Sequence, residues 1–244
     1  MTTVVPTSEE DPALSVVRFT ADLSWADAGP EVAEGRILFN LYNLLDNPYS
    51  QFFVNMKALN LAISGKVTEY VLPSFGKMEN FLKEWNLGVK DRRDLFLAVS
   101  NLLKDSKGSA KDSFDFLVKY LETFSGDDVL AVDEGKEEAV RAVIEFVKAP
   151  DMFQGDLLDM PAIAQLERDA KYAPIYQLLK IFLTKRLEAY LDFYSSNSSI
   201  LGSYGLVHED LLVSKMKLIS LVDLGKNESG QISYSLIKET LHIE

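Results

Sequence analysis

Apolar side chains recur at intervals of about three to four residues along most of the chain, the spacing that places them on one face of an α-helix. Short polar breaks, many with glycine or proline, interrupt this pattern. Helices of this kind, joined by short breaks, are typical of stacked helix pairs that pack mainly on their neighbours. The pattern predicts an all-α fold, with helices over 9–28, 36–45, 51–63, 67–85, 91–104, 111–124, 134–148, 174–194 and 208–224.

Two proline-containing stretches set expected helix ends in the first half of the chain. Asp46-Asn47-Pro48 is expected to end the helix over 36–45, and Ser50 is a candidate cap for the next helix because its hydroxyl can accept a bond from a free backbone amide. Pro73 is expected to kink or split the helix over 67–85, since proline removes an amide donor and clashes with the preceding turn.

The second half of the chain is less regular. The pattern over 149–173 predicts one or two short helices between two long ones. Serine and asparagine residues at 195–199 are expected to interrupt the longest helix, over 174–194. The last segment predicts a turn, a very short strand at 231–233 and a helix over 234–242.

The composition excludes several classes of protein. The 244 residues carry a formal net charge of −12, which opposes non-specific nucleic-acid binding through Lys and Arg. The chain has no Cys, so it holds no disulfide and no thiolate zinc site. No apolar run is long enough to span a bilayer, and no basic leader precedes an apolar stretch at the start. We therefore expect a soluble, cytoplasmic protein without a secretory signal.

A search for site motifs finds none with the required spacing. The two histidines, His208 and His242, are not in a metal-binding arrangement, and consecutive helical residues beside His208 point in different directions. A calcium loop over 225–236 would have Gly225 and Leu236 where its essential carboxylates belong. The acidic pairs are expected on solvated helix faces or in loops. We expect no catalytic residues, no cofactor and no metal.

Several stretches resemble a known family over nearly the whole chain and in the same order. They are RILFNLYNLLDNPYSQFFVNMKALNLAI at 36–63, FLKEWNLG at 81–88, EEAVRAVIEFVKAPDMF at 137–153, LLKIFLTKRLEAYLDFY at 178–194, YGLVHEDLLVSKMKLISLVDL at 204–224 and ISYSLIKETL at 232–241. They are similar to the subunit m family of eukaryotic translation initiation factor 3, which has a PCI domain, and most of all to its plant-type members.

The resemblance implies a right-handed stack of HEAT- or TPR-like helix pairs followed by a winged helix. It divides the chain into an acidic tail and helix at 1–35, the helical-repeat part at 36–203 and a partial winged helix at 204–244. The sequence differs from the other members of the family in two places. Ala33-Glu34-Gly35-Arg36 joins two segments that other members separate by further helices, and Glu244 precedes the third helix and the wing. The chain is thus expected to be internally shortened and truncated.

The resemblance also implies a role without catalysis. It implies a scaffold subunit that supports assembly of the preinitiation complex. The expected partners are other PCI-domain subunits of the factor and, indirectly, the small ribosomal subunit, with no membrane and no small-molecule substrate. In the partial winged helix, the candidate partner-contact residues are Lys215, Lys217, Ile232, Tyr234 and Lys238.

Three alternatives remain open at this point. The PCI scaffold subunit of the signalosome, which acts in cullin deneddylation, would have the same fold. An RNA-binding module would use Lys215, Lys217 and Lys238, against the net charge of the chain. An enzyme would need a pocket with convergent groups of shifted pKa.

Overall fold

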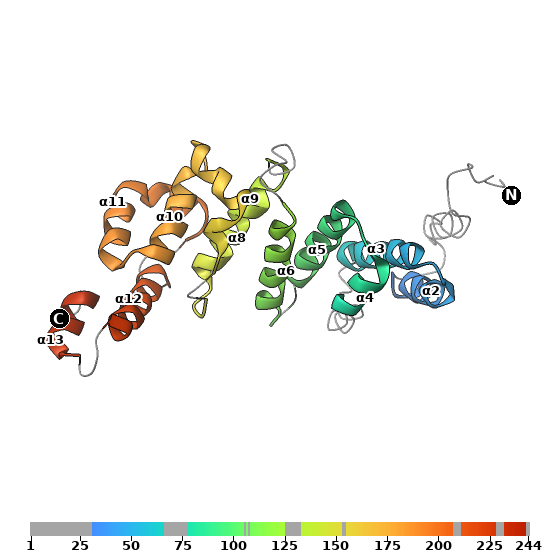
Figure 1. Ribbon diagram of the computed structural model, residues 1–244, viewed down its shortest axis with the longest axis horizontal. Helices are drawn as coiled ribbons and strands as arrows, with labels where there is room; N and C mark the ends of the chain where they lie inside the picture. Colours follow the sequence, from blue (N-terminus) through green and yellow to red (C-terminus); the bar gives the residue numbers. More distant parts are fainter. Residues whose placement is uncertain are drawn as a thin grey trace. The chain divides into compact units, whose positions relative to one another are not determined.

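The computed structural model of the chain describes residues 31–65, 78–104, 106, 108–124, 133–152, 155–206, 211–227 and 232–242. Within these ranges it contains eleven α-helices, two 3-10 helices and no strand (Figure 1). The all-α prediction is therefore confirmed. The chain divides into two compact units, Met1–Thr123 and Phe124–Glu244, which are described separately below as the first and second units. The helix predicted over 9–28 lies outside the described residues.

The first unit pairs helices that follow one another in sequence. Helix α2 packs on α3, α3 packs on α4 and α5, and α5 packs on α6 (Figure 1). Pro73 and its expected kink lie outside the described residues. Helix α2 begins earlier than the predicted residue 36, because the preceding residues Glu31–Glu34 are mostly good helix formers. The bounds are α2 (Glu31–Leu44), α3 (Pro48–Gly65), α4 (Met78–Trp85), α5 (Val89–Lys104) and α6 (Ala110–Glu122).

The cap of α3 differs from the prediction. Asn47, not Ser50, caps the helix: the backbone amide of Ser50 donates to Asn47 Oδ1 at 2.9 Å. Pro48 then occupies the first helical position, where a missing amide costs nothing and the fixed φ suits the helix. The Ser50 side chain is instead buried.

An aromatic cluster explains the FLKEWNLG stretch. Phe81 and Trp85 stack with ring centroids 5.3 Å apart, and Tyr42 of α2 and Phe52 of α3 pack against the Trp85 ring. Helix α4 ends directly after Trp85, where Asn86 has a φ of 45°, the left-handed conformation that asparagine tolerates at helix ends. The stretch therefore anchors α4 on α2 and α3 and then turns the chain into α5.

Helices α5 and α6 approach each other closely at a pair of serines. Ser100 Oγ donates to Ser113 O and Ser113 Oγ donates to Ser100 O, both at 2.9 Å. Small side chains let the two helices come near, and the reciprocal bonds satisfy both buried hydroxyls. The surrounding contact is apolar, with fully buried residues from each helix that include Leu95, Val99, Leu117 and Leu121.

The second unit packs its helices around α10. Helix α10 contacts α8, the 3-10 helix η4 and α11, while α11 contacts α12 and α12 contacts α13. The short helices expected within 149–173 are present as η3, α9 and η4. The bounds are α8 (Lys136–Lys148), η3 (Leu157–Asp159), α9 (Pro161–Ala164), η4 (Gln165–Arg168), α10 (Ala173–Thr184), α11 (Leu187–Ser203), α12 (Val213–Asn227) and α13 (Tyr234–Leu241).

The prediction of one long helix over 174–194 is wrong in two respects. The chain leaves helical geometry at Lys185 and Arg186, so two helices, α10 and α11, replace one. Helix α11 then continues through 195–199, where an interruption was expected. The polar side chains there bond back to their own helix, for example Ser195 Oγ to Asp192 O at 2.7 Å and Asn197 Nδ2 to Phe193 O at 3.0 Å.

The predicted strand at 231–233 is also absent from the described residues. Ser233 has extended backbone angles, but neither it nor Ile232 pairs with another strand, and Gln231 lies outside the described residues. Ser233 is the cap of α13 instead, because its Oγ accepts from the backbone amide of Leu236 at 3.3 Å. An extended cap residue and the start of a strand have similar backbone angles, which is why the sequence pattern suggested a strand.

Candidate partner interface

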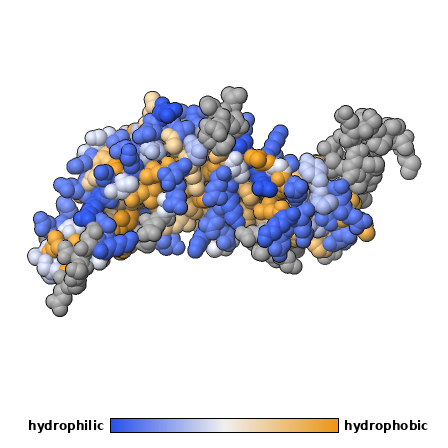
Figure 2. Space-filling model, viewed as in Figure 1, coloured by the Kyte–Doolittle hydropathy of each residue, from blue (hydrophilic) through white to orange (hydrophobic). Residues whose placement is uncertain are grey.

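Helix α12 has one buried face and one exposed apolar face. Leu212, just before the helix, and Met216, Ser220 and Leu224 within it are buried. On the other side, Leu218, Leu221 and Val222 are 47%, 36% and 49% exposed. Their spacing of three and four residues places these three side chains on one stripe of the helix. On the face seen in Figure 2, hydrophilic residues cover most of the described surface, with hydrophobic residues visible between them.

Lys215 lies inside the second unit, which corrects its expected place on the surface. Its side chain is 2% exposed. The Nζ atom donates to Phe146 O and, at 2.7 Å, to Ala149 O, and it lies 4.4 Å from the centroid of the Phe146 ring. Phe146 is in the last turn of α8, where the carbonyls lack helical partners and the helix dipole is negative. Lys215 therefore caps the end of α8.

Burial changes the proton affinity of this lysine. Loss of hydration lowers the pKa of Lys215 to about 8, and the negative charge of Asp151 opposes this fall only in part. A lysine with this environment fixes α12 to α8 and cannot reach a partner protein in this arrangement.

A second polar contact fixes the middle of α12. The backbone amide of Leu187, the first residue of α11, donates to Ser220 Oγ at 3.2 Å in a buried position. Ser220 therefore supplies the cap that the sequence around Leu187 lacks. Beside it, Arg186 Nε and Nη2 both donate to Asp223 Oδ2, at 3.1 and 2.9 Å. These bonds hold α12 at the corner between α10 and α11.

The chain enters α12 through a turn tied to α8. Lys148 Nζ donates to Tyr204 O at 3.2 Å, and Gly205 follows with a φ of 62°, a conformation that favours glycine. Two stretches that carry the family resemblance thus contact each other, although they are far apart in sequence. Lys148 of EFVKAP bonds to Tyr204, and Lys215 of SKMK bonds to Phe146 and Ala149, so α8 holds α12 in place.

Helix α13 adds further exposed side chains. None of its residues is buried, and Tyr234 is 70% exposed. Lys238 Nζ lies 5.7 Å from the centroid of the Tyr234 ring, and both Lys238 and Ile232 are half-buried. Lys217 on α12 is half-buried as well.

We use the term α12–α13 surface for the exposed or half-buried residues Lys217, Leu218, Leu221, Val222, Tyr234 and Lys238. Lys217, Tyr234 and Lys238 were predicted from the sequence, whereas the three apolar residues were not. The spacing of Leu218, Leu221 and Val222 could have predicted a second apolar stripe. These residues are at i, i+3 and i+4 on α12, opposite the buried stripe formed by Leu212, Met216 and Ser220.

Two chemical features are not found in the parts of the chain that the structure covers. Within those parts, no three His, Asp or Glu side chains gather closely enough to hold a metal ion. Among the same residues, no helix has both the length and the apolar character needed to cross a membrane.

Comparison with known proteins finds relatives that share one name. Eukaryotic translation initiation factor 3 subunit M of Dictyostelium discoideum is 35% identical over 216 residues, which cover 86% of this chain and 51% of the relative. The subunit M proteins of Nematostella vectensis and Homo sapiens are each 26% identical, over 228 and 210 residues; these cover 93% and 85% of this chain. The chain spans 51–58% of the length of these three relatives. No family model matches the sequence.

Proposed function

Because this chain is a homologue of subunit M of eukaryotic translation initiation factor 3, we propose that it is a non-catalytic scaffold subunit of that complex. In this role it supports preinitiation-complex assembly on the small ribosomal subunit through protein–protein contacts. The observation that carries the proposal is the 35% identity over 86% of the chain. Cytoplasmic localisation follows from this role, since the complex acts on ribosomes.

The α12–α13 surface is the part of the second unit that we assign to contact with neighbouring subunits. Three apolar side chains at helical spacing and an exposed tyrosine form the kind of surface that is enriched in protein interfaces. Lys217 and Lys238 are the two cationic members of this surface and provide charged contacts to the partner. We retain 204–244 as a partial winged helix and 36–203 as the helical-repeat part within this proposal.

Co-purification tests the proposal directly. The tagged chain is expressed in cells of its own source, and the eluate is probed by immunoblotting for initiation factor 3 subunits and for a signalosome deneddylase subunit. We expect the initiation factor subunits and no deneddylase. The relatives' shared name disfavours the signalosome alternative. Recovery of the deneddylase alone would reverse the assignment, and recovery of neither class would remove the support for complex membership.

A pair of variants tests the assigned surface. Leu218→Asp combined with Val222→Asp places two carboxylates on the exposed stripe, so recovery of the partner subunits should fall at least about tenfold. Ser198→Asp is the control, since it adds a carboxylate at an exposed position of α11 in the same unit. Equal recovery with both proteins would show that the neighbours bind elsewhere.

A further inference from the structure

The first unit contains an open groove between α4, α5 and α6, with a volume of about 580 Å³. Apolar side chains form part of its lining: Leu82 of α4 and Val89 and Phe96 of α5. Val89, the first residue of α5, is 56% exposed, whereas Phe96 is 8% exposed. Val89 is thus accessible to a ligand at one end of the groove, whereas the buried Phe96 forms an apolar floor further in.

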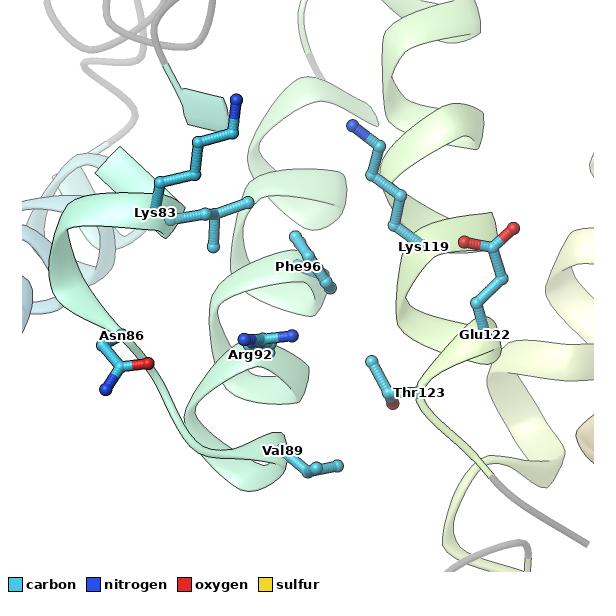
Figure 3. Close-up of a pocket in the computed structure, with 9 residues that line it drawn as sticks. Lys83, Asn86, Val89, Arg92, Phe96, Lys119, Glu122 and Thr123 are labelled. Atoms are coloured by element: carbon cyan, nitrogen blue, oxygen red, sulfur yellow. The ribbon is translucent and has the colours of Figure 1, made fainter. Parts of the chain in front are cut away.

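Three cationic side chains surround this apolar lining, one from each helix. They are Lys83 of α4, Arg92 of α5 and Lys119 of α6, and Figure 3 shows them around the position of Phe96. Among the described residues that line the groove, Glu122 is the one carboxylate. This balance differs from that of the chain as a whole, whose formal net charge is −12. The basic character of the groove is therefore local.

Contacts beside the groove hold its walls in place. Arg93 Nε donates to Thr123 Oγ1 at 3.0 Å, and Arg93 Nη2 donates to Thr123 O at 3.2 Å. These bonds join the second turn of α5 to the residue that ends α6. The Phe96 and Phe116 rings pack with centroids 6.2 Å apart, and Lys119 Nζ lies 5.2 Å from the Phe116 centroid. Arg92 and Lys119 thus project from two helices whose spacing is fixed, so a ligand need not order these two walls.

We propose that this groove binds an acidic segment of another protein, with an apolar side chain against Val89 and carboxylates facing Lys83, Arg92 and Lys119. Charge complementarity favours this occupant, because opposite charges around an apolar centre speed the encounter with the ligand and fix its orientation. Nucleic acid fits less well. Of the lining residues that the structure describes, only Phe96 is aromatic; it is 8% exposed and offers no platform for stacking bases, and Glu122 repels phosphate. The proposal does not depend on the role in translation.

The test measures binding of a defined probe to the full chain. The probe is a fluorescein-labelled peptide of about ten residues, composed of glutamates with two central leucines, a length that spans such a groove when extended. Fluorescence polarisation should give saturable binding that weakens as salt is added. A peptide with glutamine in place of every glutamate, and a second with alanine in place of both leucines, should each bind more weakly.

Charge reversals locate the binding site. Arg92→Glu and Lys83→Glu should each weaken binding of the acidic peptide by at least about tenfold, because each removes an attraction and adds a repulsion. Lys111→Glu is the matched control: it makes the same charge change at an exposed position of α6 outside the groove, and it should leave the affinity unchanged. Trp85 fluorescence and far-UV circular dichroism check that each variant is folded.

Three results would overturn the proposal. The first is no binding of the acidic peptide at concentrations up to about 1 mM, the weak end of specific recognition. The second is equal weakening by Lys111→Glu and Arg92→Glu. The third is equal binding of a single-stranded RNA that Arg92→Glu also weakens, since the groove would then recognise negative charge without regard to the protein segment.

Discussion

Replacing Lys215 by methionine should change how the stability of the second unit depends on pH. Burial lowers the pKa of Lys215 to about 8 from 10.5. Below about pH 8 the lysine is protonated in both the folded and the unfolded chain, so the full penalty for its buried charge is present. Between about pH 8 and 10.5 the folded chain has released the proton and the unfolded chain still binds it. The free energy of unfolding therefore rises with pH over this interval.

The size of the effect follows from the shift. A difference of about 2.5 pH units at about 1.4 kcal/mol each gives a rise of about 3–4 kcal/mol. This is an upper bound, because the carbonyls of Phe146 and Ala149 accept bonds from the ammonium and oppose release of the proton. Lys215→Met has no proton to release, so its unfolding free energy should lack this rise.

The assay is urea unfolding of both proteins at about pH 7.5 and pH 10, followed by far-UV circular dichroism, with the difference between proteins taken at each pH. Other groups titrate in both proteins and cancel in this comparison. Both tryptophans, Trp25 and Trp85, precede Phe124, so tryptophan emission reports on the first unit and should be unaffected by the substitution. Parallel pH profiles of the two proteins would refute the view that Lys215 carries a desolvated charge.

Three further substitutions test single contacts. Ser220→Ala should destabilise the second unit by about 1–3 kcal/mol, because the buried amide of Leu187 loses its acceptor; hydrogen exchange of the first turn of α11 should accelerate, while an unchanged rate would exclude this role for Ser220. Asn47→Ala should lower the stability of the first unit by about 1 kcal/mol in a tryptophan-monitored urea titration, whereas Asn47→Ser should retain most of it. Gly205→Ala should lower the melting temperature, since its φ of 62° strains any residue with a Cβ, and an unchanged melting temperature would contradict this conformation.

The sequence predicted the helices whose ends are set locally. Helices α5, α6 and α8 match their predicted ranges within about two residues, which is the usual ambiguity at helix ends. Each has a clear apolar stripe and a nearby break, so neighbouring residues determine where it lies. The absence of strands from the described residues also follows from this periodicity, since alternating patterns are nearly missing from the chain.

The division between α10 and α11 was not predictable in the same way. The residues on both sides are apolar and helix-forming, and no glycine or proline marks the break. The cap of Leu187 comes from Ser220, 33 residues later in the chain, and Arg186 is held by Asp223. Local patterns contain no information about a cap that another helix supplies.

The position of Lys215 was missed for a related reason. Lysine is among the residues least often buried, so a surface contact was the natural expectation. Its burial depends on carbonyls at the end of α8, 66 and 69 residues away. Lys217, Ile232, Tyr234 and Lys238 stay predictions as partner contacts. The apolar stripe of Leu218, Leu221 and Val222 was recognised only from the exposure of its individual side chains.

The caps supplied by α12 have a consequence for synthesis of the chain. The N-terminus of a chain leaves the ribosome first, so α8 and the start of α11 emerge before Lys215 and Ser220 do. Until then, the last carbonyls of α8 and the first amide of α11 must bond to water. The second unit can therefore reach its final packing only when α12 has left the exit tunnel. A nascent chain that stalls earlier would expose to chaperones the surface on which α12 later packs.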